Sequence, residues 1–371
     1  MASLPMHPGK APMWLVRRMK SLGRQIIEAF ILDYSPDALL QRLSDPYWFQ
    51  CLACVLAYDW HSSGTTTVLG GVLRDILTPD LGVLAAGGKG KASKKTVSQL
   101  EAIGEAFDLS VKEVRSLQRA SRLSAKVDNA AVQDGYQLYH HLFFVSSSKR
   151  WAVIQQGMST DKKLNGYARR YHWISDDITS FVDEPHSAIL ASRQESFVLD
   201  LTAKESEETR KTTRDLACEA PSRLSRAFST ISSSSRLTLD RWLKNDIPSS
   251  WSLGGVKEMV LPKRLNWEAL ERAYELQPSN FEGLLEIQGI GPATIRGLTL
   301  VSELLWGVQA SWKDPAKFSF AYGGKDGVPF PVDRFGMQQS LAILEDAIAN
   351  SKMGNHIKTN ALKRLSRFAY G

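Results

Sequence analysis

The spacing of apolar residues along the chain predicts a largely helical protein. Between residues 14 and 58, apolar side chains recur every three or four positions and basic side chains stand between them, which is typical of amphipathic helices. Pro36 and Pro46 divide this region into shorter helices. Further helices are expected over residues 68–77 and 97–107.

Strand-like composition is concentrated near the middle of the first half. Residues 136–145 and 151–158 are rich in aromatic and β-branched side chains, and the polar residues 146–150 separate them. This arrangement predicts a β-hairpin. The expected fold class is therefore α+β and predominantly helical, with a helical N-terminal region, a small sheet and a helical C-terminal region.

A Ser-rich stretch around residues 232–235 predicts a linker or insertion between two halves. A chain of 371 residues is long enough for more than one domain. We therefore expect an α+β domain over residues 1–200, a helix and linker over 201–262, and a helical domain over 263–371; the candidate residues described below make the first the expected catalytic domain and the last the expected DNA-binding domain.

Composition narrows the class of protein. Hydrophobic residues make up 43% and charged residues 23%, which is typical of a globular chain. The formal net charge of +7 favours a polyanionic partner, although such a charge also serves solubility alone. Three cysteines exclude a disulfide scaffold, and the apolar company of Cys51 and Cys54 favours burial in a helix. No apolar run is long enough for a membrane span, so we expect a soluble, cytoplasmic protein without a membrane partner.

A Gly- and Lys-rich stretch over residues 85–96 is the first candidate for phosphate binding. It contains Lys89, Lys91, Lys94 and Lys95 and no acidic residue. A basic, glycine-rich segment before a helix can seat phosphate groups, although a solvated loop has the same composition. Its spacing differs from that of a Walker loop, which argues against nucleotide hydrolysis.

Residues 281–305 predict two short helices joined by a Gly-Ile-Gly-Pro turn at Gly289, Ile290, Gly291 and Pro292. The segment resembles the helix-hairpin-helix element of repair nucleases, glycosylases and ligases. That resemblance implies contacts from the turn and Thr294 to the DNA backbone, independent of base sequence. Ala293 stands where such elements usually carry Lys. The C-terminal residues 351–371 add five basic residues and no acidic one.

Histidines and carboxylates are concentrated in the first half of the chain, where such side chains are suited to binding a divalent ion that activates water. We predict metal-dependent phosphodiester chemistry with Mg²⁺ or Mn²⁺, and Asp134, His140 and Glu184 are the proposed ligands. Because neighbouring residues of a strand face opposite sides, only one of His140 and His141 can face a given site. Each histidine is also open to a purely structural role. The candidate catalytic residues are Asp59, His61, Asp128, Asp134, His140, His141, Gln156, Glu184 and His186.

A basic and aromatic run over residues 169–173 is a further candidate for nucleic-acid binding. Arg169 and Arg170 precede Tyr171, His172 and Trp173. Cations of this kind contact phosphates, and aromatic rings stack on bases. We therefore predict that Arg169 and Arg170 bind DNA.

The whole chain resembles a prokaryotic, largely archaeal family catalogued as domain of unknown function 763. The resemblance rests on seven segments, namely residues 43–50, 59–64, 87–91, 125–130, 139–141, 155–158 and 318–334. It implies a DNA-processing role, with nuclease activity as the leading expectation.

Three functions remain open from the sequence. The first is a metal-dependent endonuclease or nickase acting in DNA repair. The second is a glycosylase-like base-excision enzyme that uses Asp333, which lies 42 residues after Gly291. The third is a DNA-binding scaffold without catalysis. The oligomeric state and the choice between duplex, nicked and single-stranded DNA are left undetermined.

Overall fold

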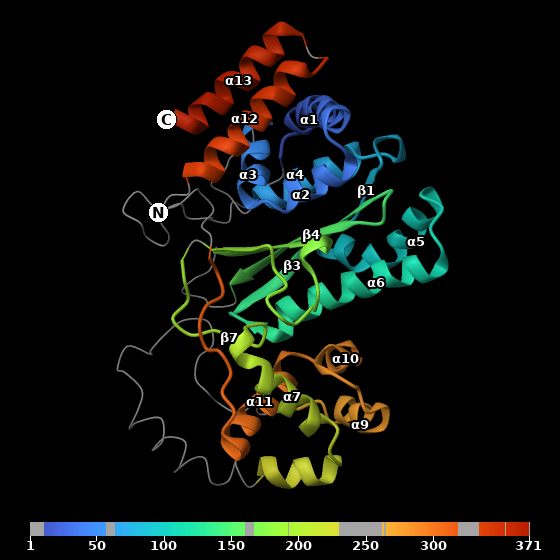
Figure 1. Ribbon diagram of the computed structural model, residues 1–371, viewed down its shortest axis with the longest axis vertical. Coiled ribbons are helices and arrows are strands. Elements are labelled where there is room, and N and C mark those ends of the chain that lie inside the picture. The colour runs from blue at the N-terminus through green and yellow to red at the C-terminus, as the bar shows by residue number, and fades with distance from the viewer. Residues whose placement is uncertain are drawn as a thin grey trace.

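The computed structural model describes residues 11–56, 64–159, 167–191, 193–229, 262, 265–317, 334–352 and 354–370. It is predominantly helical and contains a central antiparallel sheet, which confirms the predicted α+β class. Helices lie above and below this sheet (Figure 1). None of the described helices has the length and apolar character that a membrane crossing requires.

The central sheet has five antiparallel strands in the order β1-β3-β4-β5-β6. Their bounds are β1 Val83–Lys89, β3 Tyr136–Ser146, β4 Trp151–Ser159, β5 Ala168–Ile174 and β6 Ala188–Ala191. A small second sheet pairs β2, Val132–Gln133, with β7, Leu199–Asp200. The predicted hairpin is confirmed as β3 and β4. In its register His140 pairs with Gln156 and His141 with Gln155, so the two pairs face opposite sides of the sheet.

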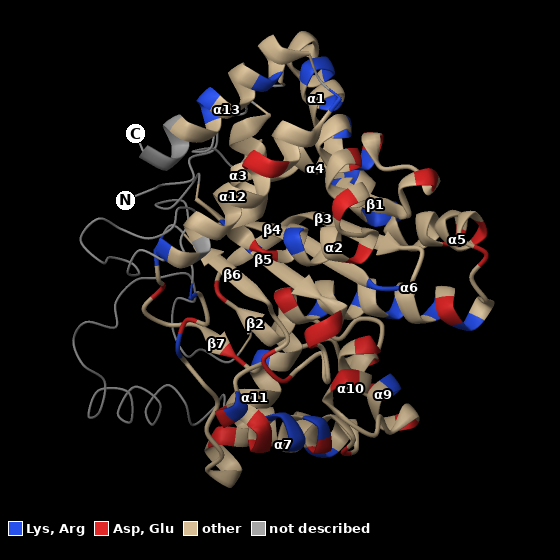
Figure 2. Ribbon diagram, turned by 45° about the horizontal axis from the view of Figure 1, so that its top comes forward, with Lys and Arg blue, Asp and Glu red and all other residues tan. Residues whose placement is uncertain are grey.

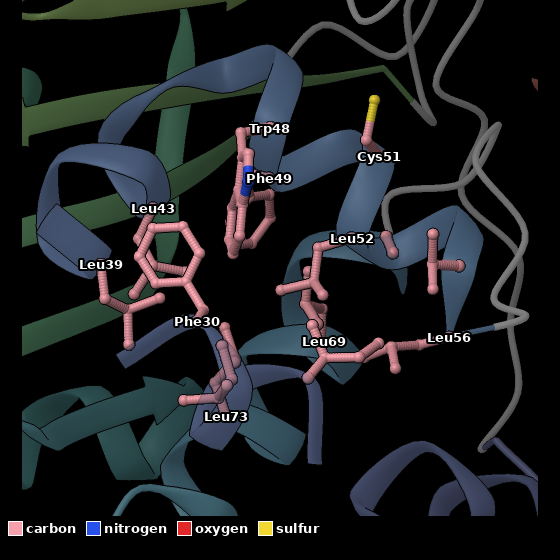
Figure 3. Packing of buried hydrophobic residues seen from close by; sticks show 14 of the residues in the cluster. Phe30, Leu39, Leu43, Trp48, Phe49, Cys51, Leu52, Leu56, Leu69 and Leu73 are labelled. Atoms are coloured by element: carbon pink, nitrogen blue, oxygen red, sulfur yellow. The ribbon is translucent and has the colours of Figure 1, made fainter. Parts of the chain in front are cut away.

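The upper face of the sheet, as Figure 1 is drawn, is covered by N-terminal and C-terminal helices together. Their bounds are α1 Met13–Asp33, α2 Pro36–Ser44, α3 Pro46–Val55, α4 Gly64–Ile76, α12 Arg334–Asn350 and α13 Asn355–Tyr370. Figure 3 shows Trp48 and Phe49 of α3 packed close to Phe30 of α1, and Cys51 on α3. Both Cys51 and Cys54 are buried on this helix, as the sequence predicted.

The lower face is covered by α5, Thr96–Ala106, and α6, Val111–Lys126. Alternate strand residues such as Phe143 and Val153 face these helices and belong to the same core. A single π-helical turn, Val127–Ala131, follows α6 directly. The helices farther down are α7 Glu207–Ala217, α9 Trp267–Leu276, α10 Phe281–Glu286 and α11 Pro292–Trp306.

The region predicted as one C-terminal domain is divided in the structure. Helices α9, α10 and α11 share the lower core with α6, whereas α12 and α13 pack on α1 and α3 above the sheet (Figure 1). The predicted boundary near residue 200 also crosses a shared core, because α7 packs against α11 and belongs to the same cluster as Trp173 of β5. The chain therefore wraps around one sheet from both ends.

Candidate active-site cavity beside strand β3

A chain of buried polar side chains runs beneath the sheet. The Ser121 Oγ of α6 lies 2.9 Å from His141 Nε2, and His141 Nδ1 lies 2.9 Å from Gln155 Oε1. Gln155 Nε2 in turn donates to Asp128 Oδ2 at 2.5 Å. Residues from α6, β3, β4 and the π-helical turn are thus joined into one hydrogen-bonded series.

Asp128 is the acceptor at the end of this series. Its Oδ2 also accepts a bond from Trp173 Nε1 at 3.0 Å, and its Oδ1 lies 2.5 Å from His186 Nε2. Complete burial raises the pKa of Asp128, and the contacts with His186 and Trp173 act in the opposite direction. Because π-helical turns occur frequently at functional sites, the position of Asp128 within one is consistent with a functional role.

The donors and acceptors in the series have a definite direction. The indole of Trp173 can only donate, so Asp128 Oδ2 is an acceptor. The Gln155 amide therefore presents its nitrogen to Asp128 and its oxygen to His141, whose Nδ1 donates. His141 Nε2 is left as the acceptor for the Ser121 hydroxyl. Burial lowers the pKa of His141 to about 4, so its ring is neutral near pH 7.

A cavity of about 270 Å³ opens at the Ser121 and His141 end of the series. Ser121, His141 and Gln155 are part of its lining, and the exposed cations Lys94 and Arg122 also line it. Neither Lys94 nor Arg122 takes part in an ion pair within the described part of the chain. The cavity therefore combines a neutral imidazole with positive charge that is not paired with any carboxylate in the described ranges.

The Gly- and Lys-rich segment forms one wall of this cavity. Contrary to the loop expected from its composition, it continues β1 through Lys89 and then forms a 3-10 helix, Gly90–Lys95, that leads directly into α5. Gly87 has φ +95° and lies against the His141 carbonyl. Its amide donates to Gln99 Oε1 at 2.7 Å. All four lysines of the segment are exposed.

A model of the family described as "Protein of unknown function (DUF763)" matches residues 1–332. The chain belongs to this family. No curated protein and no solved structure matches it. The part matched by the DUF763 model includes the cavity and the α10–α11 turn, whereas α12 and α13 follow it.

The structure does not bring together the metal ligands predicted for this DUF763 chain. His140 lies on the upper side of the sheet and Asp134 is held below it, where Arg169 Nη1 and the Tyr171 hydroxyl donate to its Oδ2. Glu184 is exposed and 3.5 Å from Lys204. The predicted set is corrected accordingly. Among the described residues, no group of three His, Cys, Asp or Glu side chains is placed to hold a metal ion.

The predicted DNA-binding pair on β5 is also corrected. Arg169 and Arg170 are both fully buried, because β5 is an interior strand covered on both faces. Arg169 forms a two-pronged ion pair with Asp314, at 2.9 and 2.7 Å. Arg170 lies over the Phe49 ring on the upper side. Neither guanidinium reaches the surface, so neither contacts DNA in this structure.

The remaining predicted catalytic residues on the upper face form a separate polar cluster. Gln156 Nε2 donates to the Tyr139 hydroxyl, and Gln156 lies on the same side as His140 and Arg170. Burial lowers the pKa of His140 to about 3. Within the described residues, neither ring nitrogen of His140 has a hydrogen-bond partner.

Side chains of α6 and α9 hold the α10–α11 turn by hydrogen bonds to its carbonyl groups. Lys126 Nζ donates to the Ile290 carbonyl at 2.6 Å, and Arg272 donates to the Gln288 carbonyl. Gly289 has φ +90° and is exposed, Gly291 is half-buried, and Ile290 and Thr294 are buried. Only part of the predicted backbone-binding turn is therefore at the surface.

Three predicted residues, Asp59, His61 and Asp333, lie outside the described residues. Sequence reasoning missed Ser121, which lies in the middle of α6. The helical period supplied a signal for it, because Leu117, Ser121 and Ser124 lie on one buried face of α6, where a hydroxyl requires a partner. His141, Gln155, Asp128 and His186 were within the segments singled out, but the sequence did not join them.

Proposed function

We propose that this DUF763 protein binds DNA and cleaves its phosphodiester backbone, with the reacting phosphate held in the cavity beside β3. The observation that carries the proposal is the meeting of His141 with Lys94 and Arg122 in one cavity. A phosphodiester brings the negative charge that this cavity lacks. A neutral imidazole beside it supplies a proton acceptor.

The charge around the cavity supports a polyanionic substrate. Lys89, Lys91 and Lys95 are exposed on the same segment as Lys94, and none forms an ion pair with a described residue. Basic side chains are also distributed along α6, which carries five of them and one acidic residue (Figure 2). Neutralising successive phosphates with the exposed cations at the cavity, Lys94 and Arg122 among them, releases counterions and drives sequence-independent binding.

The proposed chemistry at His141 is proton transfer. Its Nε2 takes a proton from the attacking group, and its Nδ1 stays bonded to Gln155, which keeps the ring in one orientation. The pKa of about 4 keeps the acceptor form available at neutral pH, and an entering phosphate anion raises this pKa. Lys94 and Arg122 stabilise the charge that develops on the phosphate oxygens.

The α10–α11 turn supports the same substrate as a second point of contact. It resembles a helix-hairpin-helix turn, and Lys126 ties it to α6 one helical turn after Arg122. A single helix thereby connects the cavity with the turn. We propose that the exposed backbone of the turn at Gly289 contacts DNA phosphates outside the cavity.

The deciding experiment is cleavage of supercoiled, linear and single-stranded DNA with Mg²⁺, Mn²⁺ or EDTA. The described residues offer no group of three His, Cys, Asp or Glu side chains for a metal ion, and the EDTA reaction tests whether cleavage requires Mg²⁺ or Mn²⁺. Wild-type protein is expected to nick or cut DNA. The double variant Lys94→Ala/Arg122→Ala is expected to lose at least about 100-fold in rate, as when charge-stabilising groups are removed.

Lys112→Ala provides a matched control. Lys112 is an exposed cation on the same helix, ten residues or about 15 Å along the axis from Arg122. Its removal is expected to leave cleavage within about twofold of wild type, because it is remote from the cavity. DNA binding without strand scission under every metal condition would reduce the function to a DNA-binding scaffold and overturn the proposed enzyme.

A further inference from the structure

We propose that Ser121 is a covalent nucleophile, which attacks the phosphorus atom of a phosphodiester and forms a phosphoserine intermediate. The inference rests on the proposed function, since it names the attacking group for that reaction. Ser121 was not among the catalytic residues predicted from the sequence. The geometry that points to it is the series of hydrogen bonds from Ser121 through His141 and Gln155 to Asp128.

The arrangement matches what an activated nucleophile requires. A hydroxyl lies within hydrogen-bond distance of an imidazole nitrogen, and a further group orients the imidazole through its other nitrogen. Here the two distances are both 2.9 Å, and the orienting group is the Gln155 amide oxygen. Because Asp128 is bonded to the Gln155 amide nitrogen, the amide cannot turn around without placing its oxygen against a carboxylate.

The hydroxyl of Ser121 departs from the usual behaviour of a helical serine. Such hydroxyls commonly bond a carbonyl in the preceding turn of their own helix. Ser124 does so, since its Oγ donates to the Ser121 carbonyl at 3.2 Å. Ser121 Oγ instead lies at the His141 ring, in the lining of the cavity. The same helix thus provides both the candidate nucleophile and a structural serine for comparison.

The size of the cavity fits this reaction. Its volume of about 270 Å³ is near the lower limit of ligand pockets, about 300 Å³, and suits a phosphodiester group with part of one sugar. Lys94 and Arg122 line the same space as Ser121. A phosphate held by these cations therefore lies next to the serine hydroxyl.

The reaction balances in two steps. Ser121 Oγ attacks phosphorus and transfers its proton to His141 Nε2, while the bond from phosphorus to one sugar oxygen breaks and that oxygen takes the proton. In the second step a water molecule gives a proton to His141 and attacks the phosphoserine. The bond from phosphorus to Oγ then breaks, and Ser121 regains its proton. The net change is hydrolysis of one phosphodiester to a phosphate monoester and a hydroxyl.

A fluorophosphonate probe tests the nucleophile directly, because attack by a serine on its phosphorus expels fluoride and leaves a stable adduct. The full-length wild-type protein is incubated with the probe, and the adduct is located by intact mass and peptide mapping. Labelling at Ser121 is expected in wild type and in Ser124→Ala, and is expected to be absent from Ser121→Ala. His141→Asn is expected to label about 100-fold more slowly, since general-base catalysis is lost.

The wild-type measurement does not depend on whether any variant folds. If Ser121 of the wild-type protein does not react with the probe, the proposal that Ser121 is the nucleophile is overturned. DNA cleavage that persists in Ser121→Ala also overturns it and leaves the proposed nuclease function standing. Labelling of Ser121 without DNA cleavage supports the nucleophile and overturns DNA as the substrate. The two proposals therefore fail by different results.

Discussion

The carbonyl oxygen of His141 lies so close to Gly87 that a Cβ atom on Gly87 would stand 2.2 Å from it. The same Cβ would stand 2.6 Å from Thr96 Oγ1, at the start of α5. The glycine therefore permits β1 to approach β3 closely, at the point where the Gly- and Lys-rich segment forms one wall of the cavity. Glycine is required here by the close packing between the strands as well as by the positive φ of +95°.

The first prediction concerns this close approach. Gly87→Ala is expected to lower the free energy of unfolding by at least about 2 kcal/mol, because an unfavourable φ of +95° and overpacking each cost about 1–3 kcal/mol. Gly90 is the matched control, since it also has a positive φ of +60° but open space around its Cβ position. Gly90→Ala is expected to cost only about 1 kcal/mol. Urea denaturation measures both, and equal losses would contradict the packing explanation.

The second prediction concerns the acceptor at the end of the buried series. Asp128→Ala is expected to cost about 3 kcal/mol or more, because it removes the partner of the buried Gln155 and Trp173 donors at once. Asp128→Asn retains an oxygen acceptor for both donors and is expected to cost less than half as much. Chemical denaturation of the two variants provides the comparison. A similar loss in both would show that the negative charge, rather than the acceptor, is what matters.

The third prediction is a pH dependence that arises from His141. Its pKa is about 4 in the folded protein and about 6.5 when unfolded, so the unfolded chain binds more protons between these values. The wild type must therefore lose stability from this group as pH falls from about 6.5 to about 4, by up to about 1.4 kcal/mol per pH unit. His141→Asn lacks this contribution.

The measurement is the difference in unfolding free energy between wild type and His141→Asn at several pH values. Taking this difference cancels the contributions of other buried groups, including Asp134, whose pKa burial raises to about 6. As the solution is acidified from pH 6.5 to 4, the unfolding free energy of wild type is expected to fall relative to that of His141→Asn. A difference that stays constant over this range would show that the His141 pKa is not lowered.

The fourth prediction concerns the salt dependence of DNA binding. If Lys94 and Arg122 each neutralise a phosphate, the double alanine variant is expected to reduce the slope of log K against log salt concentration by about 2. Fluorescence anisotropy with labelled duplex DNA measures this slope. The Lys112→Ala control is expected to change it by less than 1. An unchanged slope in the double variant would remove the cavity from the DNA-binding surface.

The fifth prediction concerns the bond that ties the α10–α11 turn to α6. Lys126→Met leaves the buried Ile290 carbonyl without its partner and is expected to cost about 1–3 kcal/mol. Amide hydrogen exchange in residues 287–291 is expected to become faster as the turn loosens. Lys126→Arg retains a donor and serves as the control. Unchanged exchange in Lys126→Met would show that the turn is held by its apolar contacts alone.

Features set by local periodicity were predicted correctly. The β3–β4 hairpin follows from strand composition on both sides of a polar turn, and the opposite orientation of His140 and His141 follows from the two-residue period of a strand. The helices between α1 and α5 follow from apolar spacing. Such patterns depend only on residues close together in the chain, which is why the sequence alone determines them.

Contacts between distant residues were decided only by the tertiary structure. The sequence predicted that Arg169 and Arg170 are surface cations. Both are buried in an interior strand, and Arg169 forms an ion pair with Asp314, 145 positions away. The predicted set of metal ligands is wrong because the sheet separates His140 from Asp134. Ser121 meets His141 only because α6 packs under β3. The sequence by itself determined the elements and their candidate chemistry, whereas packing between elements decided which groups meet, because a hydrogen bond depends on distance in space.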